Sequence, residues 1–149
     1  MPSSLSKIWI HAFFSTKNRA PLITQTLEPS LYEHVRQHLE HDFHCYVEEI
    51  GGAADHLHIL CLLNPNYAVK DILKNLKGES SHWINAHDFL DGKFAWQKAY
   101  TALSVSDALL KPVRNHLERQ REFHSTVSYL EELKVLLKLH RLSLRMEMG

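Results

Sequence analysis

Apolar residues along this chain fall into short runs that alternate with longer segments of helical periodicity. Four runs rich in β-branched and aromatic residues predict β-strands: residues 7–14, 43–50, 56–63 and a stretch within 94–106. Gly51 and Gly52 connect the second run to the third, which predicts two antiparallel neighbours joined by a short turn. The pattern therefore predicts a sheet of at least four strands.

Helical spacing predicts four helices: residues 28–41, 69–86, 107–123 and a last helix that ends near residue 140. Pro112 must lie in the first turn of the third helix or kink it, because proline cannot donate the hydrogen bond of a helix interior. Ser125 or Ser128 is the expected N-cap of the last helix, whose leucines form one apolar face.

The order strand–helix–strand–strand–helix–strand is that of the split βαβ, or ferredoxin-like, arrangement, which RRM-like domains also have. We therefore expect an α+β fold in which an antiparallel sheet carries helices on one face and further helices follow at the C-terminus. No repeat or low-complexity stretch divides the 149 residues, which predicts a single domain over 1–149 with its core at about 8–140. This fold hosts many functions and does not identify one.

Composition limits the class of protein and leaves its function open. Apolar residues make up 44% and charged residues 23%, as in soluble globular proteins. Without a membrane-length apolar run or a signal-peptide core, we expect a cytoplasmic protein with no membrane partner. Cys45 and Cys61 lie in apolar runs without zinc-ribbon spacing, which favours buried free thiols. Lys plus Arg equal Asp plus Glu at 17 each, so the net charge carries no signature of a nucleic-acid partner.

His56 and His58 are the most informative candidates for chemistry. They begin an apolar strand, where side chains two positions apart point to the same face of the sheet. Two neighbouring imidazoles on a rigid strand form half of a metal site. The alternative is that one histidine packs in the core and the other meets water, because so short a motif often occurs without a metal.

A divalent ion needs further ligands, and the amide oxygen of Gln120 on the predicted third helix is a candidate. Positions i and i+4 share a helix face, so His116 and Gln120 should project together. Two imidazoles and one amide would leave open positions for a phosphate and water, as metal-assisted phosphoryl transfer requires. The alternative is that Gln120 is an ordinary surface residue of a helix.

Two basic segments are candidates for contacting nucleic acid, one in the predicted second helix and one in the loop after the first strand. The residues concerned are Lys17, Arg19, Lys70, Lys74, Lys77, His82 and Trp83. The lysines and the arginine would meet phosphates, while His82 or Trp83 would stack on a base. The alternatives are a solvated helix face with Trp83 in the core, and ordinary surface residues at Lys17 and Arg19.

Four blocks of the chain resemble, in order, the insertion-sequence-200-like transposases, small HUH single-tyrosine enzymes of mobile elements. The blocks are residues 10–19 (IHAFFSTKNR), 51–60 (GGAADHLHIL), 76–85 (LKGESSHWIN) and 94–106 (FAWQKAYTALSVS). The resemblance extends from about residue 8 to residue 137. Four ordered blocks are far more specific than a single His-x-His step, and they make a metal site at His56 and His58 the favoured interpretation.

The resemblance implies a function in DNA transposition. The two metal-binding histidines of the family fall on His56 and His58, and its third ligand, a glutamine, falls on Gln120. The family uses Mg²⁺ or Mn²⁺ to cleave one DNA strand by attack of a tyrosine, which leaves a 5′-phosphotyrosine and a free 3′-hydroxyl. Its members act as dimers on single-stranded DNA and recognise hairpins. A homodimeric, DNA-associated protein of bacteria or archaea is therefore expected.

The chain departs from the family at the nucleophile. The family pattern Tyr-Ile-x-x-Gln reads His116-Leu-Glu-Arg-Gln120 here, so a histidine stands where the attacking tyrosine is expected. Three explanations remain open. Strand cleavage is lost while DNA binding persists, or another tyrosine such as Tyr100 or Tyr129 substitutes, or His116 itself acts as nucleophile or metal ligand.

The function indicated by these observations is that of a transposase that cleaves and rejoins single-stranded or hairpin DNA through a metal-assisted covalent intermediate. The alternative is a non-catalytic or domesticated protein that binds hairpin DNA with the same fold. A metal-dependent hydrolase unrelated to DNA does not account for the four blocks. With zero net charge, DNA binding is expected to use a local patch formed by Lys17, Arg19, Lys70, Lys74 and Lys77, with a modest dependence on salt.

Overall fold

A computed structural model describes residues 4–140 of the chain. Its strands are β1 (Trp9–Ser15), β2 (Tyr46–Ala53), β3 (His56–Leu62) and β4 (Thr101–Val105). Its α-helices are α1 (Leu27–Phe43), α2 (Val69–Ala86), α3 (Leu110–Glu118), α4 (Gln120–Phe123) and α5 (Tyr129–Leu139). Two 3₁₀ turns, η1 (Lys17–Arg19) and η2 (Asp107–Leu109), precede α1 and α3.

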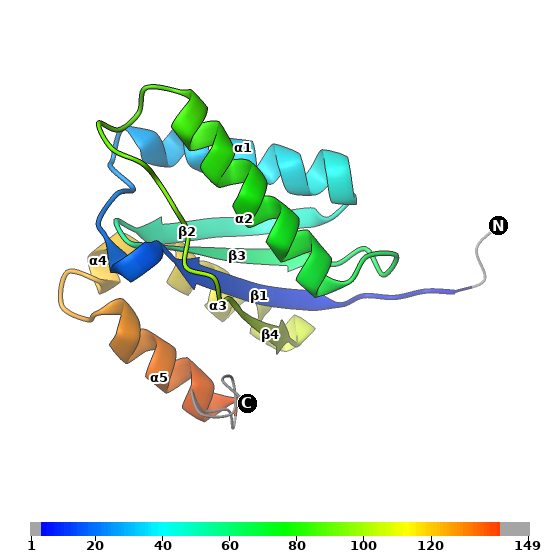
Figure 1. The fold of residues 1–149 in the computed structure, drawn as a ribbon. Coiled ribbons are helices and arrows are strands. Elements are labelled where there is room, and N and C mark those ends of the chain that lie inside the picture. Colours follow the sequence, from blue (N-terminus) through cyan, green and yellow to red (C-terminus); the bar gives the residue numbers. More distant parts are fainter. Residues whose placement is uncertain (1–3, 141–149) are drawn as a thin grey trace.

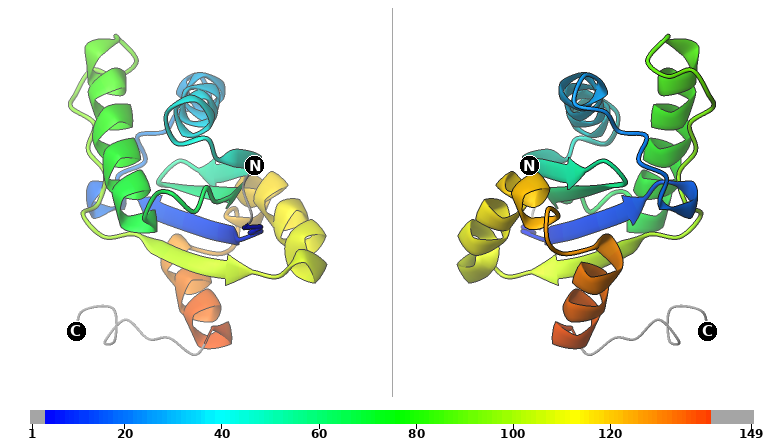
Figure 2. Two further views of the ribbon diagram at one scale, coloured as in Figure 1. Left: turned by 90° about the vertical axis from the view of Figure 1, so that its right-hand side faces the viewer. Right: turned by 90° about the vertical axis from the view of Figure 1, so that its left-hand side faces the viewer.

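The four strands form one antiparallel sheet in the order β2-β3-β1-β4. Helices α1 and α2 cover one face of this sheet, and α3, α4 and α5 lie on its other side (Figure 1 and Figure 2). The predicted α+β, ferredoxin-like arrangement with additional C-terminal helices is confirmed.

Strand β3 is buried on both faces, and its side chains point alternately into two different environments. Leu57, Ile59 and Cys61 belong to the main apolar core, which also contains the buried side chains of α1 and α2. Because neighbouring residues of a strand point to opposite faces, His56 and His58 face the layer of C-terminal helices. The same alternation on β1 places Phe13 in a second apolar cluster, with Tyr129 of α5.

Gly51 and Gly52 do not form the connection between β2 and β3, as the sequence had suggested. Both lie within β2, and the turn consists of Ala54 and Asp55. A Cβ at Gly51 would come within 1.9 Å of the carbonyl oxygen of Leu117, so the backbone of α3 packs directly on β2 at this point. Only glycine permits this approach, and it fixes the helix that carries His116.

The predicted third helix is divided into η2, α3 and α4, with a break at Arg119. Pro112 lies in the first turn of α3, where its missing N–H is tolerated. Ser128, one of the two predicted caps, begins α5 through a reciprocal capping box with Glu131. Cys45 and Cys61 are both buried and free, as predicted. Within residues 4–140, none of the helices has the length and apolar character needed to cross a membrane.

Candidate functional site

The structure brings together the three residues predicted to bind a metal. His56 and His58 project side by side from β3 and are completely buried. Gln120, the first residue of α4, reaches them from the C-terminal layer, with its Oε1 atom 2.8 Å from Nε2 of His56. We refer to His56, His58 and Gln120, the three predicted ligands, as the metal centre.

His116 lies at the edge of the metal centre, as the helical spacing predicted. Its Nε2 atom is 2.9 Å from Nε2 of Gln120, although the break at Arg119 separates the helices that carry them. The side chain is half-buried. The position expected to hold the nucleophile therefore borders the predicted metal ligands.

Two residues that the sequence reasoning missed complete this cluster. Glu132 of α5 is buried, and its Oε1 atom lies 2.9 Å from Nε2 of His58 and 3.1 Å from Nε2 of His124. Its Oε2 atom lies 2.6 Å from Nε2 of His116. Four potential ligand atoms lie within 4.8 Å of one another, close enough to surround one metal ion; they come from His56, His58, His124 and Glu132.

Two further side chains orient the histidines of the metal centre. The carboxylate of Asp55 lies 2.7 Å from Nδ1 of His56, and Nε2 of His11 lies 2.7 Å from Nδ1 of His58. A partner on the far nitrogen fixes the ring and directs the other nitrogen toward a metal. Both Nε2 atoms therefore face the interior of the cluster.

The electrostatics favour a neutral His58 and an ionised Glu132, the protonation states in which these two groups can bind a metal. Burial lowers the pKa of His58 to about 4, against the opposing effect of Glu132. Burial also lowers the pKa of His11 well below its ordinary value. Burial alone would raise the pKa of Glu132, but hydrogen bonds from His116, His124 and His58 hold that pKa well below its usual range. At neutral pH His58 is therefore a neutral imidazole beside the ionised carboxylate of Glu132.

The donor set fits a divalent cation. Histidine nitrogens together with amide and carboxylate oxygens bind ions of intermediate hardness such as Mn²⁺, whereas Mg²⁺ prefers oxygen ligands alone. His56, His58 and Gln120 would hold such an ion, with His124 and Glu132 within reach.

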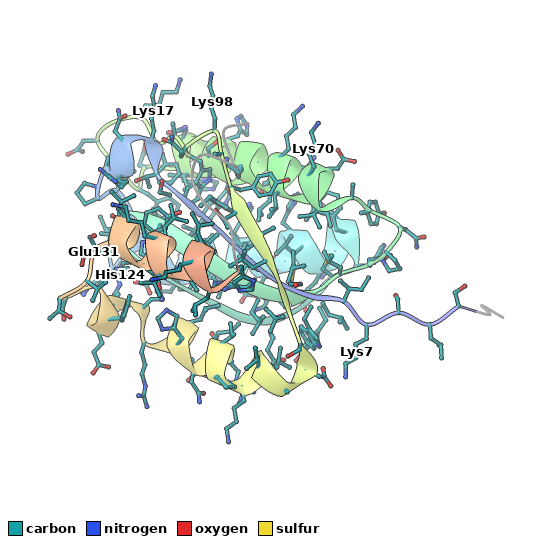
Figure 3. The ribbon with its side chains drawn as sticks, turned by 90° about the horizontal axis from the view of Figure 1, so that it is seen from below. Lys7, Lys17, Lys70, Lys98, His124 and Glu131 are labelled. Atoms are coloured by element: carbon teal, nitrogen blue, oxygen red, sulfur yellow. The ribbon has the colours of Figure 1, made fainter. Side chains whose placement is uncertain are left out.

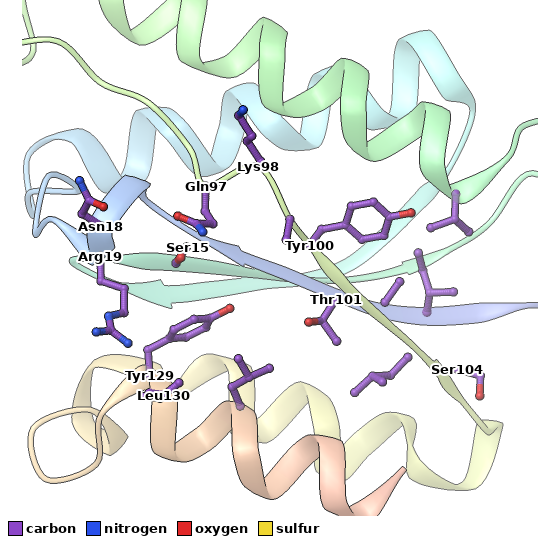
Figure 4. A pocket seen from close by; sticks show the side chains of 16 residues that line it. Ser15, Asn18, Arg19, Gln97, Lys98, Tyr100, Thr101, Ser104, Tyr129 and Leu130 are labelled. Atoms are coloured by element: carbon purple, nitrogen blue, oxygen red, sulfur yellow. The ribbon is translucent and has the colours of Figure 1, made fainter. Parts of the chain in front are cut away.

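A groove of about 1150 Å³ lies between η1, β4 and α5, next to the metal centre (Figure 4). Its polar lining includes Arg19, Gln97 and Lys98. Asn18 and Arg19 have left-handed backbone conformations, which cost energy for residues other than glycine and often occur at functional sites. The cationic and amide side chains make the groove suitable for an anionic chain.

Tyr129 links this groove to the metal centre. Its ring centroid lies 4.6 Å from that of His56, while its side chain also lines the groove. Burial raises the pKa of its phenol. Tyr129 and Gln120 are not related by helical spacing, and their proximity arises because the chain turns back between α4 and α5. Tyr100 also lines the groove but packs against the main core.

The predicted DNA-contacting residues fall into two groups in space. Lys17 and Arg19 are exposed in η1, and Arg19 lines the groove. The other five, Lys70, Lys74, Lys77, His82 and Trp83, are all on α2, which covers the opposite face of the sheet from the metal centre.

Two of the residues on α2 have structural contacts of their own. Trp83 is half-buried and stacks on His34, with ring centroids 4.1 Å apart. Lys77 donates to the backbone carbonyls of Lys98 and Ala99, and so holds the chain that leads into β4. Lys70 and Lys74 are exposed, as is His82.

Known proteins share the sequence pattern and the fold of this chain. Residues 4–120 match the family described as "Transposase IS200 like". No curated protein matches the chain. Among solved structures, a candidate transposase from Deinococcus radiodurans is 21% identical with a TM-score of 0.63, over 81% of this chain and 96% of the other. A REP-associated tyrosine transposase bound to a REP hairpin is 13% identical with a TM-score of 0.55, over 79% of this chain and 67% of the other.

Both structural likenesses are at low identity and establish a common fold. The family match covers most of the chain and includes every strand of the sheet, His56, His58 and, as its last residue, Gln120. The chain therefore belongs to the IS200-like transposase family.

Proposed function

We propose that this chain binds single-stranded or hairpin DNA and brings one phosphodiester to the metal centre, where the strand is cleaved and rejoined. The observation that supports this most strongly is the 2.8 Å distance between Nε2 of His56 and Oε1 of Gln120. Predicted ligands from two elements far apart in the sequence thus lie together. The proposed cofactor is Mg²⁺ or Mn²⁺, of which the donor set favours Mn²⁺. A bound cation would polarise a phosphoryl oxygen and stabilise the charge that develops during transfer.

The DNA-binding part of the proposal is supported by the arrangement of charge. Lys17, Lys70 and Lys98 project from the same edge of the molecule (Figure 3). Arg19 and Lys98 line the groove that reaches Tyr129 beside the metal centre. Phosphates held along this edge would guide a strand into the groove. The hairpin bound by the REP-associated relative is consistent with this assignment.

His116 stands at the nucleophile position of this proposal. A histidine can form a covalent phosphoryl intermediate, and Nε2 of His116 borders the metal centre. In such a step a bond from Nε2 to phosphorus forms while the bond from phosphorus to the 3′-oxygen breaks, and that oxygen takes up a proton. Tyr129 is the other candidate, because it contacts His56.

A second function, hairpin-DNA binding without strand cleavage, is favoured by one observation. Nε2 of His116 lies 2.6 Å from Oε2 of Glu132, so the nitrogen that would attack phosphorus is already paired with a carboxylate. In this alternative the fold and the groove retain DNA binding after the loss of the tyrosine.

One assay separates the two functions. The full chain is incubated with Mn²⁺ and a fluorescently labelled single-stranded hairpin DNA, and denaturing gels reveal strand cleavage and covalent protein–DNA adducts. The enzyme function is supported if the natural chain cleaves the DNA and if cleavage is abolished both by a chelator and by His58→Ala. Hairpin binding with neither cleavage nor adduct contradicts the enzyme and supports the binding protein. Recovery of cleavage by His116→Tyr would then show that only the nucleophile is missing.

A homodimer is the proposed assembly. Val135 and Leu139 of α5 are 58% and 73% exposed, and both border an apolar groove of about 570 Å³. Exposed apolar side chains beside a groove favour association with a second copy. Sedimentation of the purified chain as a dimer would support this, and a monomer at micromolar concentration would contradict it.

A further inference from the structure

Helix α5 inserts a buried carboxylate into the metal centre from outside the part of the chain that matches the family. The family match ends at residue 120, whereas Glu132 lies in α5 and is 3% exposed. Its two oxygens lie within hydrogen-bonding distance of His58 and His124 on one side and of His116 and Gln120 on the other. A buried carboxylate with so many partners is placed by the fold and is not an incidental neighbour.

His124, the histidine next to it, directs its Nε2 atom toward the same point. Nδ1 of His124 donates to the carbonyl oxygen of Val127 across 2.5 Å, so a neutral His124 ring has its lone pair on Nε2. This Nε2 atom lies 3.0 Å from Oε1 of Gln120 and 3.1 Å from Oε1 of Glu132, and both of these oxygens are acceptors. Three potential ligand atoms therefore converge on one point.

His56 directs its Nε2 atom to the same point. Its Nδ1 donates to the carboxylate of Asp55, which leaves Nε2 facing Oε1 of Gln120. Exchanging the oxygen and nitrogen positions of the Gln120 amide does not remove this contact between two potential acceptors. Its NH₂ group donates to Oε2 of Glu132 across 2.8 Å, and the turned amide would place its oxygen against that carboxylate. A cation at the point of convergence satisfies all of these atoms together.

We propose that His124 and Glu132 are additional ligands of the cation held by the metal centre, and that α5 docks more tightly when this cation is bound. The inference rests on the proposed function, because it adds ligands to the cation assigned there. With these two additional ligands, three imidazole nitrogens and one carboxylate would surround the ion. That donor set selects a transition metal such as Mn²⁺ over Mg²⁺.

The test is Mn²⁺ binding to the full chain, measured by calorimetry after treatment with a chelator. Glu132→Gln and His124→Gln should each weaken Mn²⁺ binding by at least about tenfold, because even residues that only orient a ligand change metal affinity by about 10–100-fold. The matched controls, Glu122→Gln and His41→Gln, change exposed residues and should bind Mn²⁺ as the natural chain does. Thermal unfolding without metal identifies any variant that does not fold.

Hydrogen exchange of the natural chain provides a second measurement that needs no substitution. Mn²⁺ should slow exchange at the amides of residues 129–139, because a ligand that binds the docked helix stabilises it. If His58→Ala abolishes Mn²⁺ binding while Glu132→Gln and His124→Gln bind normally, the inference is wrong. The assignment of the metal centre is then still supported. Unchanged exchange of α5 on Mn²⁺ binding also contradicts it. If the natural chain does not bind Mn²⁺, the proposed metal centre fails as well.

Discussion

Oε2 of Glu132 lies 2.6 Å from Nε2 of His116, the residue at the position where the family resemblance expects a tyrosine. The carboxylate comes from α5 and the histidine from α3, and both border the metal centre. The pair explains how a histidine is accommodated there, since an ionised carboxylate matches an imidazole N–H. It also means that restoring the tyrosine changes the partner of a buried charge.

His116→Tyr should therefore have two effects. If only the nucleophile has been lost, Mn²⁺-dependent cleavage of hairpin DNA and a covalent adduct appear in this variant. Removal of one hydrogen-bond partner of a buried carboxylate should lower the free energy of unfolding by about 1–3 kcal/mol, as measured by urea denaturation. The double variant His116→Tyr with Tyr129→Phe distinguishes the attacking residue. Loss of the adduct in the double variant would contradict attack by the introduced tyrosine.

Asp55 should tune the affinity for metal without binding it. Its carboxylate accepts from Nδ1 of His56, and Asp55→Asn removes the charge that makes this imidazole a better ligand. We expect about 10–100-fold weaker Mn²⁺ binding by calorimetry. Asp91→Asn, at an exposed position in the segment between α2 and β4, is the control. Equal affinities for the natural chain and Asp55→Asn would exclude this role.

Gly51 should be intolerant of a side chain, in contrast to Gly78. A Cβ at Gly51 meets the backbone of Leu117, and Gly51→Ala should lower the free energy of unfolding by about 1–3 kcal/mol through overpacking. Gly78 is in the middle of α2, and a Cβ there would have no neighbouring atom within 4 Å, so Gly78→Ala should raise that free energy by up to about 1 kcal/mol. Urea denaturation measures both, and a stable Gly51→Ala would disprove the tight contact of α3 with β2.

The stability of the metal-free chain should fall in mild acid. The pKa of His58 is lowered to about 4 in the folded chain, against an ordinary value of 6.5. Below pH 6.5 the unfolded chain therefore binds the proton more readily, and stability is lost progressively as the pH falls toward 4. The lowered pKa values of His11 and Glu132 act in the same direction, and the raised pKa of His124 opposes them in part. Urea denaturation in chelator at pH 8, 6 and 5 tests this, and equal stability at all three values would contradict it.

The groove beside Tyr129 should contribute to DNA affinity through charge. The double variant Arg19→Ala with Lys98→Ala should weaken hairpin binding and reduce the slope of log affinity against log salt by about one for each phosphate that is no longer neutralised. Lys111→Ala, at an exposed position on α3, should leave that slope unchanged. A double variant with an unaltered slope would place the DNA elsewhere on the surface, for example along α2.

Most of the fold was predictable because the signals are local. The alternation that places His56 and His58 on one face of β3 is a property of any strand, and the i, i+4 spacing of His116 and Gln120 survives the break at Arg119. The role of Gly51 and Gly52 was misjudged, because glycine indicates equally well a turn or a close approach of two backbones, and here α3 packs on them.

The rest of the site depends on tertiary structure and had little local signal. The i, i+4 relation of Gln120 to His124 repeats that of His116 to Gln120 and would have identified His124. The spacing Ser128-x-x-Glu131 identifies Glu131 as a capping residue, but no local signal marks Glu132, in the same first turn of α5, as a site residue. Only the turn of the chain between α4 and α5 directs one carboxylate into the metal centre and the other into a helix cap.

The most direct test of the metal centre is a crystal structure of the chain grown with Mn²⁺, with anomalous diffraction used to locate the ion. We expect a single strong peak within bonding distance of Nε2 of His56 and His58 and of Oε1 of Gln120. A peak elsewhere, or these three atoms hydrogen-bonded to one another with no ion between them at saturating Mn²⁺, would contradict the assignment of these residues as metal ligands.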